Sequence, residues 1–237
     1  MKTALVTGAN RGIGFELTKD FLKNNINVIV AARTPENVRA TIDKLSDIDT
    51  LANASGIVID LNDKNTIQAA KHQFESNDLS LDYLVNNAGI AGDMSHGALK
   101  TTESDIKKTL DVNLFGTMEI IKAFLPFVTD AQGKIANLTG PYEAVKWYNP
   151  TAYRVSKVAL DALIQSFAID FKNNEIPVQI FGVFPGGVST DINHHRQGPN
   201  MKTVEEAGTQ IINLITNHED YNGDIVSSTG QILVELK

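Results

Sequence analysis

The stretch that decides the fold is Thr7-Gly8-Ala9-Asn10-Arg11-Gly12-Ile13-Gly14, which follows the apolar run Ala4-Leu5-Val6. Its three glycines let the backbone turn tightly and come close to a ligand. Helical periodicity over residues 12–24 begins at once, so the stretch predicts a strand, a glycine loop and the start of a helix. The N-terminus of a helix favours a pyrophosphate. The spacing is not G-x-G-x-x-G, so an ordinary strand-to-helix turn is the alternative at this point.

Short apolar runs and longer helical segments alternate along the rest of the chain. We expect strands at 4–7, 28–32, 57–60, 83–86, 135–139, 178–184 and about 224–228, followed by a short tail at 231–236. We expect helices at 12–24, 35–46, 63–76, 102–127, 151–173 and 203–217. Pro126 is expected to end or kink the fourth helix. Unbroken alternation predicts one α/β domain over residues 1–237, a doubly wound parallel sheet flanked by helices on both faces.

The bulk composition narrows the classes of partner. The 237-residue chain carries a net charge of −7, which is unlike a nucleic-acid-binding surface. It contains no cysteine, so no disulfide is expected, and a cytoplasmic location fits that absence. The first apolar run is too short for a signal peptide, and no other run approaches a membrane span. We therefore expect a small-molecule ligand and neither nucleic acid nor membrane as a partner.

The end of the second expected strand indicates which nucleotide the glycine loop would hold. Ligands of doubly wound sheets lie at the carboxyl ends of the strands, where NAD-binding proteins place an acidic residue on the adenosine ribose. Here that position is Ala32, and Arg33 follows it. Arg33, with Arg11 from the glycine loop, would pair with a 2′-phosphate. This pattern predicts NADP(H), and the alternative is that both arginines are solvated surface charges.

Further motifs follow the later strands in a fixed order. Asn86-Asn87-Ala88-Gly89 comes after the fourth strand, Asn113 lies within Asp111–Gly116, Tyr153–Lys157 reads Y-x-x-x-K, and Pro185–Thr190 begins with Pro-Gly. Together with the glycine loop, these motifs resemble those of the short-chain dehydrogenase/reductase family over nearly the whole chain. The resemblance implies a Rossmann-type fold. It also implies an NADP(H)-dependent, carbonyl reductase-like oxidoreductase that reduces a ketone or aldehyde to an alcohol, or the reverse.

Tyr153 and Lys157 stand four residues apart, so they share one face of a helix. A tyrosine with a pKa of about 10 is a poor proton carrier at neutral pH, and a nearby ammonium lowers that pKa. Tyr153 would then protonate the carbonyl oxygen as the hydride arrives. The resemblance adds that Lys157 binds the nicotinamide ribose and that Asn113 holds a water in the proton relay. The alternative is a surface Tyr–Lys pair on an amphipathic helix.

The resemblance also implies which residues contact the cofactor. Asp60 would bind the adenine amino group and Leu61 would line its pocket, although a strand-end cap is an equal alternative for Asp60. Val188 and Thr190 would meet the carboxamide or the phosphates. The full expected set is Gly8, Asn10, Arg11, Gly12, Ile13, Gly14, Arg33, Asp60, Leu61, Asn87, Ala88, Gly89, Tyr153, Lys157, Pro185, Gly186, Val188 and Thr190.

The chain departs from the family pattern at one catalytic position. The family's serine stands thirteen residues before the tyrosine, and here that residue is Gly140, which has no side-chain donor. Thr139 can fill the role, although neighbours on a strand point to opposite faces. Otherwise Tyr142 or a backbone amide takes it with a loss of rate, or the protein is a cofactor-binding sensor or scaffold with little turnover. We expect Thr139 to fill the role, so the expected catalytic set is Asn113, Thr139, Tyr153 and Lys157.

Three further segments bear on substrate and assembly. Residues 142–148, with Trp147, are expected to overhang the nicotinamide pocket or to pack onto the body of the protein. A short substrate lid is expected near 189–202, and its adjacent His194 and His195 indicate a polar loop, with no metal site. The third segment is part of the helix expected at 151–173. Four of its apolar residues form either a contact face of a homodimer or homotetramer or part of the core: Ala159, Leu160, Leu163 and Phe167.

Overall fold

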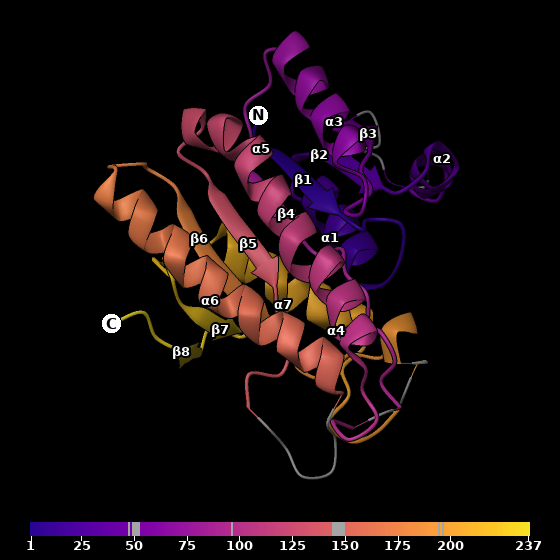
Figure 1. Ribbon diagram of the computed structural model, residues 1–237. Coiled ribbons are helices and arrows are strands. Elements are labelled where there is room, and N and C mark those ends of the chain that lie inside the picture. The colour runs from indigo at the N-terminus through magenta and orange to yellow at the C-terminus, as the bar shows by residue number, and fades with distance from the viewer. Residues whose placement is uncertain (47, 49–52, 96, 144–149, 194, 196) are drawn as a thin grey trace.

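The computed structural model describes residues 1–46, 48, 53–95, 97–143, 150–193, 195 and 197–237. An eight-stranded sheet in the order β3-β2-β1-β4-β5-β6-β7-β8 crosses the molecule (Figure 1). Strands β1 to β7 pair in parallel, and β8 runs antiparallel to β7. The parallel doubly wound sheet is thus confirmed, and the expected tail adds an antiparallel edge strand. The strands are β1 (Thr3–Thr7), β2 (Asn27–Ala32), β3 (Ala54–Val58), β4 (Tyr83–Asn86), β5 (Lys134–Leu138), β6 (Gln179–Phe184), β7 (Ile225–Ser227) and β8 (Ile232–Val234).

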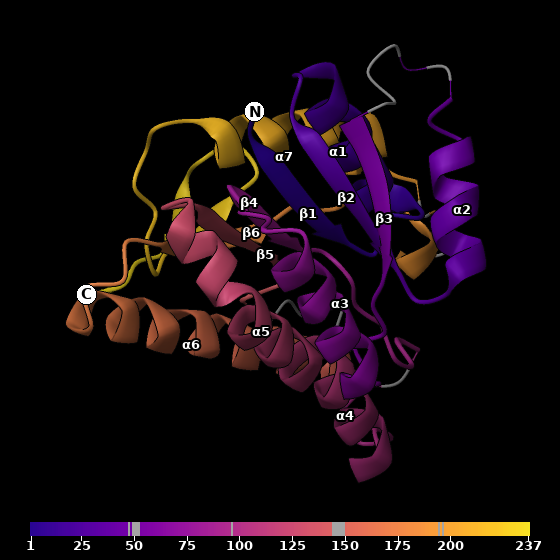
Figure 2. The same ribbon diagram turned by 90° about the horizontal axis from the view of Figure 1, so that it is seen from above.

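Helices cover both faces of the sheet (Figure 2). Helices α1 and α7 pack together on one face, and α3, α5 and α6 lie on the other. Because neighbouring residues of a strand point to opposite faces, Leu5 enters the core under α5 and α6 while Val6 enters the core under α1 and α7. The helical segments are α1 (Gly12–Lys23), α2 (Pro35–Asp43), α3 (Lys64–Ser76), α4 (Glu103–Leu110), η2 (Asp111–Gly116), α5 (Thr117–Asp130), α6 (Thr151–Asn173), η3 (Asp191–Asn193) and α7 (Val204–Thr216).

The third strand begins earlier than the sequence pattern indicates. It was expected at 57–60, but β3 spans Ala54–Val58 and lies at the edge of the sheet. Ser55 and Gly56 are exposed there, so half of the strand carries no apolar pattern that a sequence reading can detect. Asp60 consequently lies two residues beyond the end of the strand.

The helix expected at 102–127 is a composite of α4, η2 and α5. Its irregularity is the π-helical turn η2, which contains Asn113, and α5 continues past Pro126 to Asp130. Pro126 therefore does not end the helix, and a kink at this residue stays a prediction. The buried side chains of Phe127 and Val128 just beyond the proline keep this turn packed on the core, which offsets the lost hydrogen bond.

The same composite helix corrects a second expectation. Glu103–Asp130 is long and apolar enough to cross a membrane by length and composition, and it is the one such helix in the part of the chain that the structure describes. The side chains of Ile120, Ile121 and Phe124 in this helix are fully buried in the core. Packing against the sheet and α3 thus accounts for its apolar character.

Candidate active site

The glycine loop between β1 and α1 adopts backbone conformations, and packs at distances, that favour glycine. Gly8 and Gly12 adopt φ angles of +64° and +55°, in the left-handed region that favours glycine. An ideal Cβ at Gly14 would lie 2.4 Å from both the side-chain nitrogen of Asn87 and the carbonyl oxygen of Gly8. Glycine at these positions therefore lets the loop turn into α1 while it packs directly against Asn87, and the start of α1 is the position at which a helix favours a phosphate.

The loop after β4 is fastened to this glycine loop. The side-chain amide of Asn87 donates to the carbonyl oxygens of Thr7 at 2.9 Å and Gly8 at 3.2 Å. The buried hydroxyl oxygen of Thr7 accepts from the backbone N–H groups of Asn87 and Ala88, both at 3.0 Å. Thr7 thus joins two cofactor loops, a role that the sequence reading did not assign to it although it opens the motif.

The two arginines expected at the 2′-phosphate stand in different surroundings. Arg33 is exposed and forms neither ion pair nor hydrogen bond with the described residues. Arg11 forms an ion pair with Asp191 of η3, with 3.1 Å between the nitrogen and the oxygen. The second carboxylate oxygen of Asp191 lies 2.7 Å from Nε2 of His195. Arg11 therefore joins the glycine loop to the expected lid, and Arg33 is the arginine available to an incoming phosphate.

At the expected adenine end, the structure contains the alternative foreseen for Asp60. One carboxylate oxygen of Asp60 accepts from the backbone N–H of Asn62 at 3.0 Å, which is a strand-end cap. Leu61 is buried, and an ideal Cβ on Gly116 would lie 2.6 Å from the Cβ of Leu61. Capping uses one lone pair of the carboxylate, so an adenine contact by Asp60 stays a prediction.

Asn113 is fully buried and binds three elements together. Its side-chain amide donates to the carbonyl oxygen of Ile90 and to the hydroxyl of Ser156, both at 2.9 Å. Its side-chain oxygen accepts from the N–H of Ile90 at 2.8 Å. Ser156 in turn donates to the carbonyl oxygen of Tyr153 at 2.7 Å. Both amide protons of Asn113 are thus used within the protein, and Ser156 is a supporting residue that sequence reasoning missed.

Lys157 lies buried beneath Tyr153. Its ammonium nitrogen is 5.9 Å from the centre of the Tyr153 ring and donates to the carbonyl oxygen of Leu138 at 2.6 Å. Burial lowers the pKa of Lys157 to about 8, and the carboxylate of Asp161, one turn further along α6, opposes that shift. Burial raises the pKa of Asp161 to about 7. The expected Tyr–Lys pair is therefore not a solvated surface pair, since its lysine is enclosed.

The position of the missing serine is tightly packed. An ideal Cβ on Gly140 would lie 2.7 Å from Cγ and 2.9 Å from Cβ of Lys157, and 3.3 Å from the Tyr153 ring. Gly140 thus lies against Tyr153 and Lys157, where a side chain has no room. The hydroxyl oxygen of neighbouring Thr139 is buried, with no hydrogen-bond partner among the described residues. The methyl group of Thr139 packs over Gly182 of β6, whose ideal Cβ would approach it to 2.8 Å.

The Pro-Gly segment closes the site from the β6 side. Gly186 has a φ angle of +78°, and Val188 is buried and bridges to Lys202. An ideal Cβ on Gly12 would lie 3.8 Å from the methyl carbon of Thr190, so this segment reaches the glycine loop. The loops that follow β1, β4, β5 and β6 therefore meet at the carboxyl end of the sheet (Figure 1). Of the remaining expected cofactor residues, Asn10, Gly89 and Pro185 lie in these same loops, and Ile13 lies in the first turn of α1.

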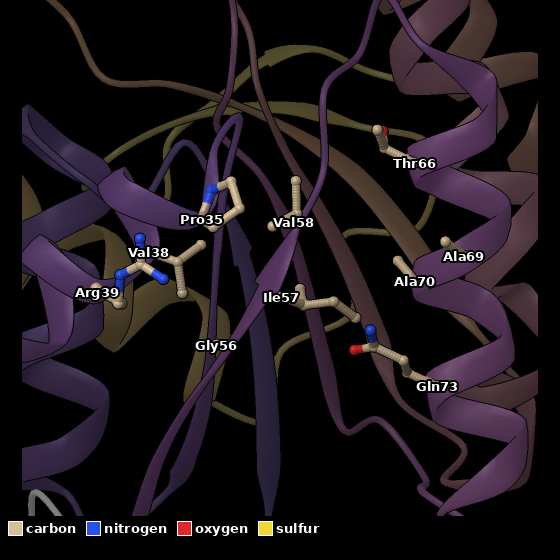
Figure 3. Close-up of a pocket in the computed structure, with 10 residues that line it drawn as sticks. All are labelled: Pro35, Val38, Arg39, Gly56, Ile57, Val58, Thr66, Ala69, Ala70 and Gln73. Carbon is tan, nitrogen blue, oxygen red and sulfur yellow. The ribbon is translucent and has the colours of Figure 1, made fainter.

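Other expected features lie outside this cluster or outside the described residues. Residues 144–149, with Trp147, and His194 are not described, while the ring of Tyr142 packs edge-on against Phe184 at 6.1 Å. No group of three or more His, Cys, Asp or Glu that could hold a metal occurs among the described residues. A hollow of about 330 Å³ lies between α2, β3 and α3 (Figure 3), but no residue of the expected catalytic set lines it.

A doubly wound sheet with a glycine loop, and with Tyr153 above a buried Lys157 at its carboxyl edge, is the arrangement of a nicotinamide-dependent oxidoreductase. A family model described as short chain dehydrogenase matches residues 2–200. The short-chain dehydrogenase anuI of Penicillium roqueforti is 30% identical over 229 residues, which are 90% of this chain and 87% of the relative. The chain belongs to the short-chain dehydrogenase/reductase family.

Two solved structures show how far the fold is shared. The carbonyl reductase Sniffer of D. melanogaster matches with a TM-score of 0.85 and 26% identity over 99% of both chains. The NADPH-bound carbonyl reductase from chicken fatty liver matches with a TM-score of 0.88 and 24% identity, again over 99% of both chains. The fold of this chain is therefore that of the family from end to end.

Proposed function

We propose that the protein transfers a hydride between NADP(H) and the carbonyl carbon of a ketone or aldehyde. The observation that carries this proposal is that Lys157 is buried beneath Tyr153, at the same carboxyl edge of the sheet as the glycine loop. Two structurally similar proteins are carbonyl reductases, and one of them binds NADPH. Arg33, which is exposed and has no ion-pair partner among the residues that the structure describes, supports NADP(H) over NAD(H).

The residues of the site fit a dinucleotide. The glycine loop would hold the diphosphate, Arg33 the 2′-phosphate, and the Pro-Gly segment the nicotinamide end. The cofactor, when bound, supplies the hydride. Tyr153 donates its phenolic proton to the carbonyl oxygen, and the ammonium of Lys157 stabilises the phenolate that remains. Asn113 acts by holding the loop at Ile90 and the α6 backbone at Tyr153 in place.

Thr139 is the proposed second donor to the carbonyl oxygen. With its methyl over Gly182, its hydroxyl is enclosed, and rotation about the Cα–Cβ bond would exchange the two groups. Thr139→Val keeps the shape and removes only the hydroxyl. If Thr139 donates, turnover falls by roughly 10²–10³, as when another enzyme loses one such donor. Stability should rise by about 1 kcal/mol, because an unsatisfied buried hydroxyl is removed. Unchanged turnover in Thr139→Val would remove the residue from the catalytic set.

The decisive experiment follows the absorbance of reduced nicotinamide with NADPH and, separately, NADH against a panel of ketones and aldehydes. Turnover that prefers NADPH and is abolished in Tyr153→Phe supports the reductase. Tyr83→Phe serves as the matched control, since it removes the same hydroxyl from the first residue of β4, at the opposite end of the sheet, where that hydroxyl binds Lys2. Equal turnover by Tyr153→Phe and wild type would overturn the assignment.

Gly140 favours a second candidate function, a cofactor-dependent sensor or scaffold. A family member without a side-chain donor at this position loses part of the stabilisation of the developing alkoxide. Tight binding of NADPH together with an absence of turnover across a broad substrate panel would favour this candidate. Titration of NADPH fluorescence measures that binding without requiring any reaction.

A further inference from the structure

Lys202 joins the two ends of the lid through its backbone. Its N–H donates to the carbonyl oxygen of Gly187 at 2.9 Å, and its carbonyl oxygen accepts from the N–H of Ser189 at 3.0 Å. Lys202 thereby forms a parallel bridge with Val188, which is buried. The pairing of Ser189 with Lys202 thus closes the base of the expected lid directly beside the Pro-Gly segment.

The side chain of Lys202 fastens this base to the body of the protein. Its ammonium donates to the hydroxyl of Ser228 at 2.7 Å and to the side-chain oxygen of Gln210 at 3.0 Å. Ser228 also donates to that Gln210 oxygen at 2.7 Å, and its backbone N–H donates to the carbonyl oxygen of Phe184 at 3.1 Å. One ammonium therefore links the lid base to Gln210 of α7 and to Ser228, which follows β7. Ser228 in turn binds the end of β6.

The ammonium also lies directly beneath Gly186. An ideal Cβ on Gly186 would stand 3.4 Å from the nitrogen of Lys202 and 3.5 Å from the carbon that carries it. Among the described residues no carboxylate lies within ion-pair distance of this ammonium, and two neutral oxygens hold it. Lys202 is partly buried, and withdrawing a charge from water with only neutral partners costs free energy, so an apolar side chain of the same length would serve packing alone at least as well.

We propose that Lys202 is a positioning residue that fixes the segment Pro185–Val188 where the nicotinamide half of the cofactor lies. This inference rests on the proposed function. The ammonium acts through Gly186 and the lid base and does not touch the reacting atoms. Lys202 therefore affects how the nicotinamide end of the cofactor would bind. It leaves the binding of the adenosine end, expected near Arg33 and Asp60, unchanged.

The test compares two ligands that share the adenosine half. NADPH and 2′,5′-ADP, which lacks the nicotinamide, are titrated against wild type and Lys202→Met by calorimetry. We expect Lys202→Met to weaken NADPH about tenfold, the factor for roughly one lost charge-assisted hydrogen bond, and to change 2′,5′-ADP less than about twofold. Melting temperature should stay within about 2 °C, since Ser228 keeps its bond to Gln210.

Matched variants make the result specific. Lys172→Met removes an exposed lysine from the end of α6 and should change neither affinity. Ser228→Ala removes the shorter of the two hydrogen bonds and should give a smaller loss for NADPH alone, which keeps the inference testable if Lys202→Met does not fold. Equal weakening of both ligands, or of neither, would overturn the positioning role. A wild type that binds neither ligand would instead overturn the proposed function.

Discussion

At the scale of single residues, charge at the cofactor edge is divided between engaged and available groups. Arg11 is committed to Asp191 of the lid, whereas Arg33 has no partner among the described residues. An exposed ion pair contributes about 0–1 kcal/mol, so a phosphate can still displace Asp191 from Arg11, but at some cost. The two arginines should therefore contribute unequally to the choice of nucleotide.

We predict that Arg33→Ala lowers the preference for NADPH over NADH by about ten- to a hundredfold, the range for one lost hydrogen-bonded charge of about 1.5–3 kcal/mol. Arg11→Ala should lower it by less than about tenfold. The measurement is the ratio of kcat/KM for the two nucleotides. Arg39→Ala, which removes an exposed arginine paired with Glu36 on α2, is the control. A larger loss in Arg11→Ala than in Arg33→Ala would contradict the division.

The pair Lys157 and Asp161 predicts a pH dependence. Burial lowers the pKa of Lys157 to about 8, and the Asp161 carboxylate raises it again. Asp161→Asn removes that support, so the pKa of Lys157 falls further, and the upper limb of the pH profile of kcat/KM should move to lower pH. The effect belongs above pH 7, where Asp161, with its pKa raised to about 7, is ionised in the wild type. An upper limb at the same pH in both proteins would contradict it.

The same substitution should also change how the stability of the fold depends on pH. Because the folded-state pKa of Asp161 is raised from 3.8 to about 7, the folded protein retains a proton that the unfolded chain has lost between these values. Stability from this group is therefore present at low pH and is lost as pH rises through about 7. Melting temperature should accordingly fall less between pH 5 and 8 in Asp161→Asn than in wild type.

Much of the site is predictable at this scale, because each motif follows a strand and parallel strands bring their carboxyl ends together. Tyr153 and Lys157 are recognisable from their spacing together with the glycine loop, and Asn113 is recognisable from the resemblance of its motif to that of the family. The hydroxyls of Thr7 and Ser156 are not, since their partners lie 80 and 43 residues away and no local pattern encodes such distances. The burial of the Thr139 hydroxyl likewise depends on Gly182 of a different strand.

At the scale of elements, the approach of β5 to α6 sets the geometry of catalysis. We predict that Gly140→Ser, which restores the family residue, does not raise turnover and destabilises the fold by about 1–3 kcal/mol. Its Cβ would overlap the first carbons of Lys157, which cannot swing aside as a chain end can. Denaturant unfolding and turnover of the variant check both parts. Gly140→Ala is the control, because it adds the same Cβ without a hydroxyl. Higher turnover at unchanged stability in Gly140→Ser would show that the joint has room.

Elements also show where sequence patterns lose information. The central strands are covered on both faces, so their apolar runs are continuous and easily recognised. Edge strands β3 and β8 are short or half exposed, and their bounds were missed in part for that reason. The π-helical turn η2 leaves the apolar periodicity of the 103–130 helix intact, so the sequence indicated one plain helix there.

At the scale of the whole molecule, the outer face of α5 and α6 is a candidate contact between two copies of the chain. Leu160 belongs to the core, but Ala159 and Leu163 line a hollow of about 280 Å³ with Leu114 and Met118. Phe115 also lines this hollow and is 47% exposed. The expected oligomeric face is thus divided between core and surface.

We predict that the protein is a homodimer and that Phe115→Glu converts it to a monomer, because a carboxylate would have to be buried between the copies. Light scattering after size-exclusion chromatography measures the mass. Leu99→Glu, at a fully exposed leucine in the chain before α4, is the control and should leave the mass unchanged. A wild type of monomer mass would sink the prediction.

The central place of β1 has a consequence for how the chain is made. β1 is synthesised before the other strands of the sheet. One of its two neighbours in the sheet, β4 (Tyr83–Asn86), is synthesised much later, after β2 and β3. At about 5–20 residues per second, several seconds pass in which β1 and β2 can pair while the other edge of β1 stays open. During translation, the nascent chain therefore offers a hydrophobic strand edge to chaperones, and slower codons between β3 and β4 would lengthen that exposure.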